Sequence, residues 1–121
     1  MVAVHRARIT VLLVEDVRDA REILAALLEM HGLHVIGAAS AAEALAAGRN
    51  QPAIDVLLAD LHLPDGNGRE VAEALTAVHP AMRSLFVSGD PPAALGARQA
   101  FLRKPVRIGA ILGAIESLLA A

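Results

Sequence analysis

Residues 54–60 read IDVLLAD, an apolar run that ends in the carboxylate of Asp60. A strand that is covered on both faces needs such a run, because neither of its faces meets water. Residues 9–14, ITVLLV, have the same character and are followed directly by Glu15 and Asp16. We therefore expect two buried parallel strands, each of which ends in acidic residues.

Strand and helix patterns alternate on both sides of these two runs. Residues 33–38, 83–87 and 100–102 are three further strand candidates, which brings the number of predicted strands to five. Such alternation is typical of parallel sheets, in which a helix crosses from one strand to the next. The sequence therefore predicts one α/β domain, with a doubly wound five-stranded parallel sheet and helices on both of its faces.

Four helices are predicted from apolar stripes and end signals. Ser40 and Glu43 form a capping box at the start of the second helix, while Gly32 and Pro80 end the first and the third. The stripes comprise Ala20, Ile23, Leu24, Leu27 and Leu28 in the first helix, Val71, Leu75 and Val78 in the third, and Ile108, Ile111, Leu112, Ile115 and Leu119 in the last. Residues 91–99 are too short and too rich in Pro and Gly for a full helix, so the helix between the fourth and fifth strands is predicted to be short or absent.

The composition narrows the class of protein. The chain has 121 residues, 55% of them hydrophobic, which suits one folded domain. A net charge of -2 gives no electrostatic case for nucleic-acid binding, and no apolar run approaches the ~20 residues of a membrane span. The lack of Cys excludes thiolate metal sites and suits the cytoplasm. We expect a flexible N-terminal arm over residues 1–8 and the folded domain over residues 9–121.

Polar residues follow four of the predicted strands at the point where each strand ends. Glu15 and Asp16 follow the first strand, Asp60 the third, Ser88 the fourth and Lys104 the fifth. Because ligands bind at the carboxyl ends of such strands, we expect these side chains to converge. Three carboxylates repel one another, and a hard cation such as Mg²⁺ or Mn²⁺ relieves that repulsion. With a hydroxyl and an ammonium group beside them, this edge suits a phosphoryl group.

The sequence resembles the response-regulator receiver domain in four segments that occur in the same order. These are VLLVED at residues 11–16, LLADLHLPDGNG at 57–68, LFVSG at 85–89 and FLRKP at 101–105. The resemblance covers roughly residues 9–119 and implies a flavodoxin-like sheet in the order 2-1-3-4-5. It also implies a phosphoacceptor domain of a two-component phosphorelay, which receives its phosphoryl group from a histidine kinase or a histidine phosphotransfer protein.

The resemblance implies a role for each matching residue. Asp60 would be phosphorylated, with Lys104 and Ser88 in contact with the phosphoryl group. The Mg²⁺ or Mn²⁺ ion would be held by Glu15, Asp16, Asp60 and the backbone carbonyl of His62. Ser88 and Phe101 would switch on activation, His62, Gly89 and Asp90 would modulate loss of the phosphoryl group, and Pro64 and Gly68 would shape the turn. Such a domain catalyses only its own phosphorylation and dephosphorylation, so we expect no enzyme in the ordinary sense.

Two positions depart from the usual pattern of the family. Ser88 and Lys104 are 16 residues apart, several fewer than usual, and the shortfall lies in the fourth helix of the signalling face. Glu15 stands where Asp is commoner. We expect the chemistry to survive both changes and partner recognition to shift toward the first helix and the strand-end loops. A curtailed fourth helix is also similar to receiver modules at the C-terminal end of hybrid kinases.

Two other functions share parts of this pattern. A pseudo-receiver is a binding module that is not phosphorylated, and the complete set of carboxylates together with Ser88 and Lys104 argues against it. A haloacid-dehalogenase-like phosphohydrolase also uses an Asp that follows a strand. That family requires a second Asp two residues later, where this chain has His62. The phosphoacceptor is therefore the favoured hypothesis.

Overall fold

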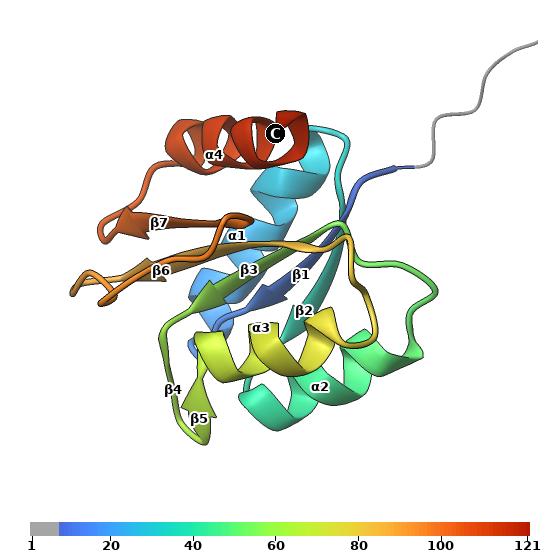
Figure 1. Cartoon of the computed structure of the whole chain (residues 1–121). Coiled ribbons are helices and arrows are strands. Elements are labelled where there is room, and N and C mark those ends of the chain that lie inside the picture. The colour runs from blue at the N-terminus through green and yellow to red at the C-terminus, as the bar shows by residue number, and fades with distance from the viewer. Residues whose placement is uncertain (1–7) are drawn as a thin grey trace, which may run out of the picture.

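A five-stranded parallel sheet forms the centre of the molecule (Figure 1). The computed structural model describes residues 8–121, so the expected N-terminal arm lies, except for Arg8, outside the described residues. The strands are β1 (Thr10–Val14), β2 (His34–Ala38), β3 (Val56–Asp60), β6 (Arg83–Ser88) and β7 (Gln99–Arg103). Their order, β2-β1-β3-β6-β7, is the expected 2-1-3-4-5 order when the strands of this sheet are numbered along the chain.

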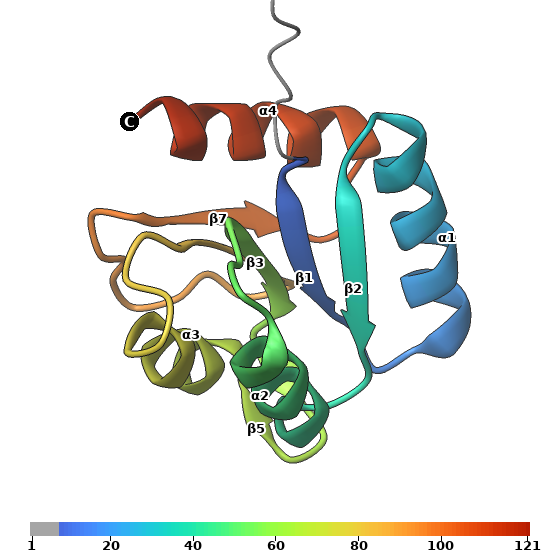
Figure 2. The same ribbon diagram turned by 90° about the vertical axis from the view of Figure 1, so that its right-hand side faces the viewer.

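Helices cover both faces of the sheet (Figures 1 and 2). The helices are α1 (Arg18–Met30), α2 (Ala41–Asn50), α3 (Gly68–Thr76) and α4 (Ile108–Ala120). α1 and α4 lie on one face, and α2 and α3 lie on the other. Within residues 8–121, no helix has the length and hydropathy that crossing a membrane requires.

The alternation of side chains along β1 and β3 explains why these strands are apolar throughout. Leu12 and Leu57 belong to the core beneath α2 and α3, whereas Leu13 and Leu58 belong to the core beneath α1 and α4. Successive side chains of a strand point to opposite faces, so a central strand covered on both sides needs apolar residues at every position. The expectation of two buried strands is confirmed.

Side-chain caps fix where α2 and α3 begin. The hydroxyl of Ser40 accepts a hydrogen bond from the backbone N–H of Glu43 at 3.1 Å, as the capping box predicts. Asn67 caps α3 in the same way, accepting from the N–H of Glu70 at 2.9 Å. After α1, Gly32 adopts a φ of 86°, a left-handed conformation that glycine tolerates best.

Three apolar residues of the predicted helical stripes lie at the surface, namely Ala20 and the larger Ile23 and Val78. Ile23 is 62% exposed, because it stands at the rim of α1 and not against the sheet. Val78 is 47% exposed, because α3 ends at Thr76. The stripe of the third helix is therefore shorter than predicted.

A small hairpin replaces the loop expected after Asp60. β4 (His62–Leu63) and β5 (Gly66–Asn67) are antiparallel, with His62 opposite Asn67. The hairpin is closed at its base by the N–H of Gly68, which donates to the carbonyl of Leu61 at 3.1 Å. Pro64 and its neighbour at the turn leave only two residues to each strand.

The connection between β6 and β7 contains no helix. Residues 89–98, all of them described, form bends and turns. This confirms the prediction from the short, Pro-rich spacing, and α4 is the C-terminal helix instead. Since no helix precedes β7, this outermost strand remains half-buried along most of its length.

Candidate functional site

Three carboxylates meet at one edge of the sheet. Glu15 and Asp16 follow β1 directly, and Asp60 is the last residue of β3. Because β1 and β3 are parallel neighbours, with Val14 opposite Ala59, these residues leave the sheet side by side. One carboxylate oxygen of each lies within 4.8 Å of the others. The structure therefore brings together the acidic residues that the sequence places at two strand ends.

Lys104, which follows the edge strand β7, completes this cluster. Its Nζ donates a hydrogen bond to Oδ2 of Asp60 at 2.5 Å. The Asp60 side chain is only 9% exposed, whereas that of Lys104 is 42% exposed. The backbone N–H of Lys104 donates to the carbonyl of Ser88 at 2.9 Å and so extends the β6–β7 ladder past the end of β7. The peptide bond that follows, Lys104–Pro105, is cis.

The charges at this edge shift the pKa values of two of its groups. Burial raises the pKa of Glu15, the charge of Lys104 opposes that rise, and the charges of Asp60 and Asp16 add to it. Burial alone would lower the pKa of Lys104, but its hydrogen bond to Asp60 and the surrounding negative charges outweigh burial and raise that pKa. The site thus holds more negative charge than Lys104 alone neutralises.

Hydrogen bonds between side chains and backbone groups hold the residues around Asp60. The N–H of His62 donates to Oδ1 of Asp60 at 3.2 Å, so His62 contributes its backbone while its ring lies at the surface. Ser88 is buried at the end of β6, and its hydroxyl oxygen accepts from the N–H of Asp90 at 3.2 Å. Asp90 is exposed, and the carbonyl of Gly89 accepts from Nε of Arg103 at 3.1 Å.

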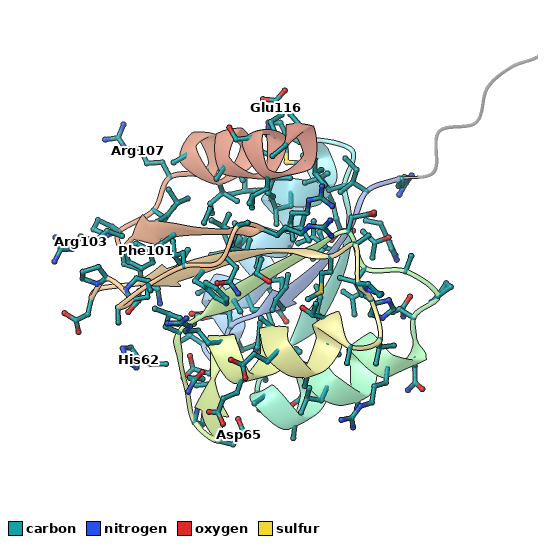
Figure 3. All side chains as sticks on the ribbon, viewed as in Figure 1. His62, Asp65, Phe101, Arg103, Arg107 and Glu116 are labelled. Atoms are coloured by element: carbon teal, nitrogen blue, oxygen red, sulfur yellow. The ribbon has the colours of Figure 1, made fainter. Side chains whose placement is uncertain are left out.

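Phe101 lies on β7 and contributes to the core of the domain. It is opposite Phe86 in the β6–β7 register and packs, half-buried, against the core on the side of α2 and α3. Figure 3 shows Phe101 and Arg103 on β7, with His62 at the start of the hairpin. Phe101 is therefore two positions removed from Ser88 along the register, and it is only half-buried.

A family model covers most of the chain. The model for the response regulator receiver domain matches residues 11–116. The chain belongs to this family. The match confirms the family predicted from the sequence, and the strand order confirms the fold. Receiver domains are modules of two-component signalling and are generally not enzymes in the ordinary sense.

Individual receiver proteins resemble the chain over nearly its full length. The response regulator receiver protein CpdR of Brucella abortus (strain 2308) is 32% identical, over 92% of this chain and 97% of CpdR. The CheY-like receiver domain protein of Methanospirillum hungatei JF-1 is 29% identical with a TM-score of 0.85, over 94% of this chain and 95% of that one. A response regulator of Burkholderia pseudomallei, solved with a phosphorylated aspartic acid, a calcium ion and citrate, is 25% identical with a TM-score of 0.79, over 93% of this chain and 69% of that one.

Two residues that support the receiver site were not singled out from the sequence. Nη1 of Arg21, on α1, donates to the carbonyl of Glu15 at 2.8 Å and so holds the backbone of the turn that contains Glu15 and Asp16. The carboxylate of Asp65, in the hairpin, accepts from backbone N–H groups at the start of α2. The Arg21 contact spans six residues but ends on a backbone carbonyl, which no side-chain pattern marks, and the Asp65 contacts depend on how distant elements meet.

Proposed function

We propose that this receiver domain is phosphorylated on Asp60, with help from a bound divalent cation, by a phosphohistidine donor. The single observation that carries the proposal is the position of the Asp60 carboxylate, buried between two other carboxylates and hydrogen-bonded to Lys104. In the reaction an oxygen of Asp60 forms a bond to phosphorus while the bond from phosphorus to the donor imidazole breaks. The electron pair of the broken bond stays on the imidazole nitrogen, which takes a proton from solvent, so the donor leaves as a neutral histidine.

The residues present fit Mg²⁺ or Mn²⁺. Oxygen ligands from Glu15, Asp16 and Asp60 match the preference of these hard cations, and the raised pKa of Glu15 reports repulsion and burial that a cation offsets. When bound, the cation supplies positive charge to the phosphoryl oxygens. The backbone carbonyl of His62 would be a further ligand. The calcium ion and phosphorylated aspartate of the Burkholderia pseudomallei relative support this assignment.

Lys104 and Ser88 contact the phosphoryl group after its transfer to Asp60. Lys104 already donates to Asp60 and exchanges that partner for a phosphoryl oxygen, which keeps its charge next to the developing negative charge. The Ser88 hydroxyl accepts from the N–H of Asp90, so its own hydrogen is free to donate to the phosphoryl group. A shift of Ser88 toward Asp60 would loosen the turn at Asp90 and reach Phe101 through the β6–β7 pairing.

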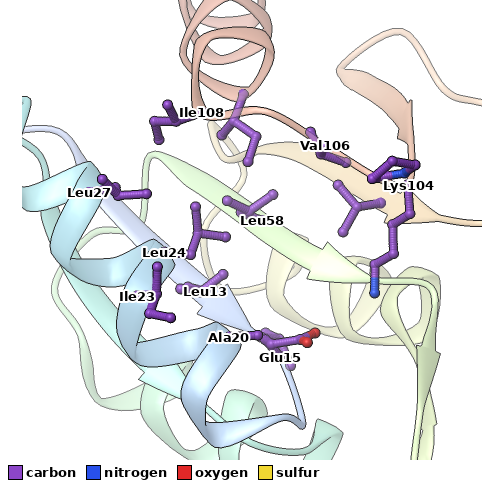
Figure 4. Close-up of a pocket in the computed structure, with 14 residues that line it drawn as sticks. Leu13, Glu15, Ala20, Ile23, Leu24, Leu27, Leu58, Lys104, Val106 and Ile108 are labelled. Carbon is purple, nitrogen blue, oxygen red and sulfur yellow. The ribbon is translucent and has the colours of Figure 1, made fainter.

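The donor docks in an apolar groove that begins at the phosphorylation site. The groove has a volume of about 660 Å³ and runs between α1 and the start of α4 (Figure 4). Glu15 and Lys104 border it at the end next to Asp60, while Ile23 and Leu24 on one side and Val106 on the other supply apolar walls. A helix of a histidine kinase or phosphotransfer protein laid along this groove would bring its phosphohistidine to Asp60.

Intact mass measurement tests the phosphoacceptor. The domain is incubated with acetyl phosphate and Mg²⁺, and the expected product carries one phosphoryl group that is stable to acid and labile to base. Asp60→Ala should gain no mass, whereas Asp90→Ala, a nearby exposed carboxylate, should still be phosphorylated. A mass gain that persists in Asp60→Ala would refute the assignment.

A further inference from the structure

Asp65 links the hairpin after Asp60 to a helix on another part of the chain. Its Oδ1 accepts a hydrogen bond from the N–H of Ala41 at 2.7 Å, and its Oδ2 accepts from the N–H of Ala42 at 2.9 Å. These two bonds lower the pKa of Asp65, so the side chain is a carboxylate at neutral pH. Both donors lie in the first turn of α2, where the helix dipole also favours a negative charge.

Asp65 is not the residue that α2 needs for its N-cap. Ser40 already serves as the cap, through its hydroxyl and through its carbonyl, which accepts from the N–H of Ala44 at 3.0 Å. An α-helix leaves its first four N–H groups without partners inside the helix. Here the Ser40 hydroxyl satisfies the N–H of Glu43, and Asp65 satisfies those of Ala41 and Ala42, so the two Asp65 bonds join the helix and the hairpin.

The opposite end of the same hairpin lies at the phosphorylation site. The N–H of His62 donates to Asp60, and the N–H of Gly68 closes the base of the hairpin on Leu61. The hairpin also fits closely against α2, since a Cβ added at Gly66 would lie 3.6 Å from the Cβ of Ala41. With two residues in each strand, any movement of the turn is transmitted to His62.

We propose that Asp65 is a positioning residue for phosphorylation: by holding the hairpin on α2, it keeps the backbone of His62 in place beside Asp60. This inference rests on the proposed function, because the position of His62 matters only where a cation and a phosphoryl group bind. Without the Asp65 bonds the hairpin is held at its base and by the packing of Leu63 and Gly66. This packing is less directional than two hydrogen bonds, so the His62 backbone spreads over several orientations. Part of the free energy of cation binding is then used to order the His62 backbone, and the affinity falls.

Two variants of Asp65 and one control separate positioning from capping. Asp65→Ala removes both bonds, and Asp65→Asn keeps one acceptor oxygen. Ser40→Ala removes a hydrogen bond from the same end of α2 without touching the hairpin. For each variant Mg²⁺ affinity is measured by calorimetry, and amide hydrogen exchange is measured without metal over residues 61–68 and over α2.

The expected result is weaker Mg²⁺ binding by roughly tenfold in Asp65→Ala, a typical effect of losing a residue that orients a metal ligand. Asp65→Asn should fall between Asp65→Ala and the wild type. Hydrogen exchange at His62 should accelerate in both Asp65 variants, while Ser40→Ala should leave it and the Mg²⁺ affinity within about twofold of the wild type.

Equal effects of Asp65→Ala and Ser40→Ala on Mg²⁺ affinity and on His62 exchange would overturn the inference and reduce Asp65 to a helix cap. Unchanged His62 exchange in Asp65→Ala would overturn it as well. These readouts stand apart from the test of the proposed function. If acetyl phosphate leaves the wild type unmodified, the proposed function fails, whereas exchange at His62 still decides whether Asp65 holds the hairpin.

Discussion

Gly68, at the start of α3, lies close to the backbone of Asp60. A Cβ at this position would lie 2.6 Å from the carbonyl oxygen of Asp60, which is backbone and has no room to yield. Gly68→Ala should therefore lower the free energy of unfolding by about 1–3 kcal/mol, the usual cost of overpacking, and should also slow phosphorylation. Gly89→Ala is the matched control, because nothing lies within 4 Å of a Cβ there.

Chemical denaturation of the two alanine variants checks this prediction. Gly89→Ala should unfold at nearly the wild-type denaturant concentration, and Gly68→Ala at a clearly lower one. Equal midpoints for Gly68→Ala and the wild type would mean that the hairpin moves away from β3 without loss of stability.

Glu15 makes the metal-free domain less stable at neutral pH. Because folding raises the pKa of Glu15 above its ordinary value of 4.5, the folded state favours the protonated form. Its contribution to stability is complete below pH 4.5 and is lost as the pH rises through the folded pKa. Glu15→Gln should therefore raise the Tm by a few degrees at pH 7 in the presence of a chelator, and change it little at pH 4.

Thermal unfolding at the two pH values, with and without Mg²⁺, measures this effect. The wild type should gain stability from Mg²⁺ at pH 7, and Glu15→Gln should gain much less. Glu29→Gln, an exposed residue of α1, serves as the control and should behave as the wild type. A Tm for Glu15→Gln below the wild type at pH 7 without metal would contradict the sign of the effect.

At the scale of elements, the connection between β6 and β7 is the weakest part of the fold. Residues 93–98 are all exposed, and Leu95, at 41% exposure, is the one large apolar side chain among them. Little apolar surface is therefore buried to offset the entropy of ordering this segment. We expect its amides to exchange within seconds, whereas those of residues 111–118 in α4 should be strongly protected.

Amide hydrogen exchange on the unmodified domain tests this directly. Protection of residues 93–98 comparable to that of residues 111–118 would reveal a stable helix between β6 and β7. Exchange of the Gln99 amide should be slower than that of its neighbours, because its N–H donates to the carbonyl of Gly96 at 3.2 Å.

The strands and most helices could be predicted because their signals are local. Apolar runs identify β1 and β3, and Ser40 with Glu43 identifies the start of α2. The hairpin after Asp60 could not be predicted, since two-residue strands carry no periodicity and Pro64 reads as an ordinary turn residue. Its attachment through Asp65 joins residues 24 and 23 positions apart in sequence, which only the packed structure reveals.

The candidate site could be predicted from the sequence for a different reason. In a parallel sheet the residues after each strand share one edge, so topology converts four distant sequence positions into neighbours. The sequence therefore places Asp60 and Lys104 at one edge, and the structure adds the hydrogen bond between them. The sequence does not reveal the contact of Arg21, because its partner is the backbone carbonyl of Glu15.

At the scale of the whole molecule, the groove beside α1 predicts how a donor protein recognises the domain. Ile23 is exposed within the groove, and Met30 on the same helix is 80% exposed outside it. Ile23→Ser should slow phosphotransfer from a phosphorylated histidine phosphotransfer protein about tenfold, equivalent to ~1.4 kcal/mol of lost binding. Phosphorylation by acetyl phosphate should be unchanged, because this small donor needs no groove.

Rates measured with both donors distinguish docking from chemistry. Met30→Ser is the matched control and should behave as the wild type with either donor. Slower reaction of Ile23→Ser with acetyl phosphate as well would place the effect in the site or the fold. Equal rates for Ile23→Ser and the wild type with the protein donor would exclude the groove as the docking surface.

The position of β7 at the edge of the sheet also affects how the domain behaves beside other chains. Ladder bonds of β7 with β6 alternate along the strand, with the carbonyl of Arg98 and the N–H of Lys104 directed inward, so the backbone groups of Phe101 and Arg103 face outward. An unpaired row of this kind is a template on which a foreign extended segment adds as a sixth strand. Arg98 and Arg103, of like charge near the two ends of this row, oppose self-association by that route. Replacing Arg98 with an apolar residue should therefore favour aggregation.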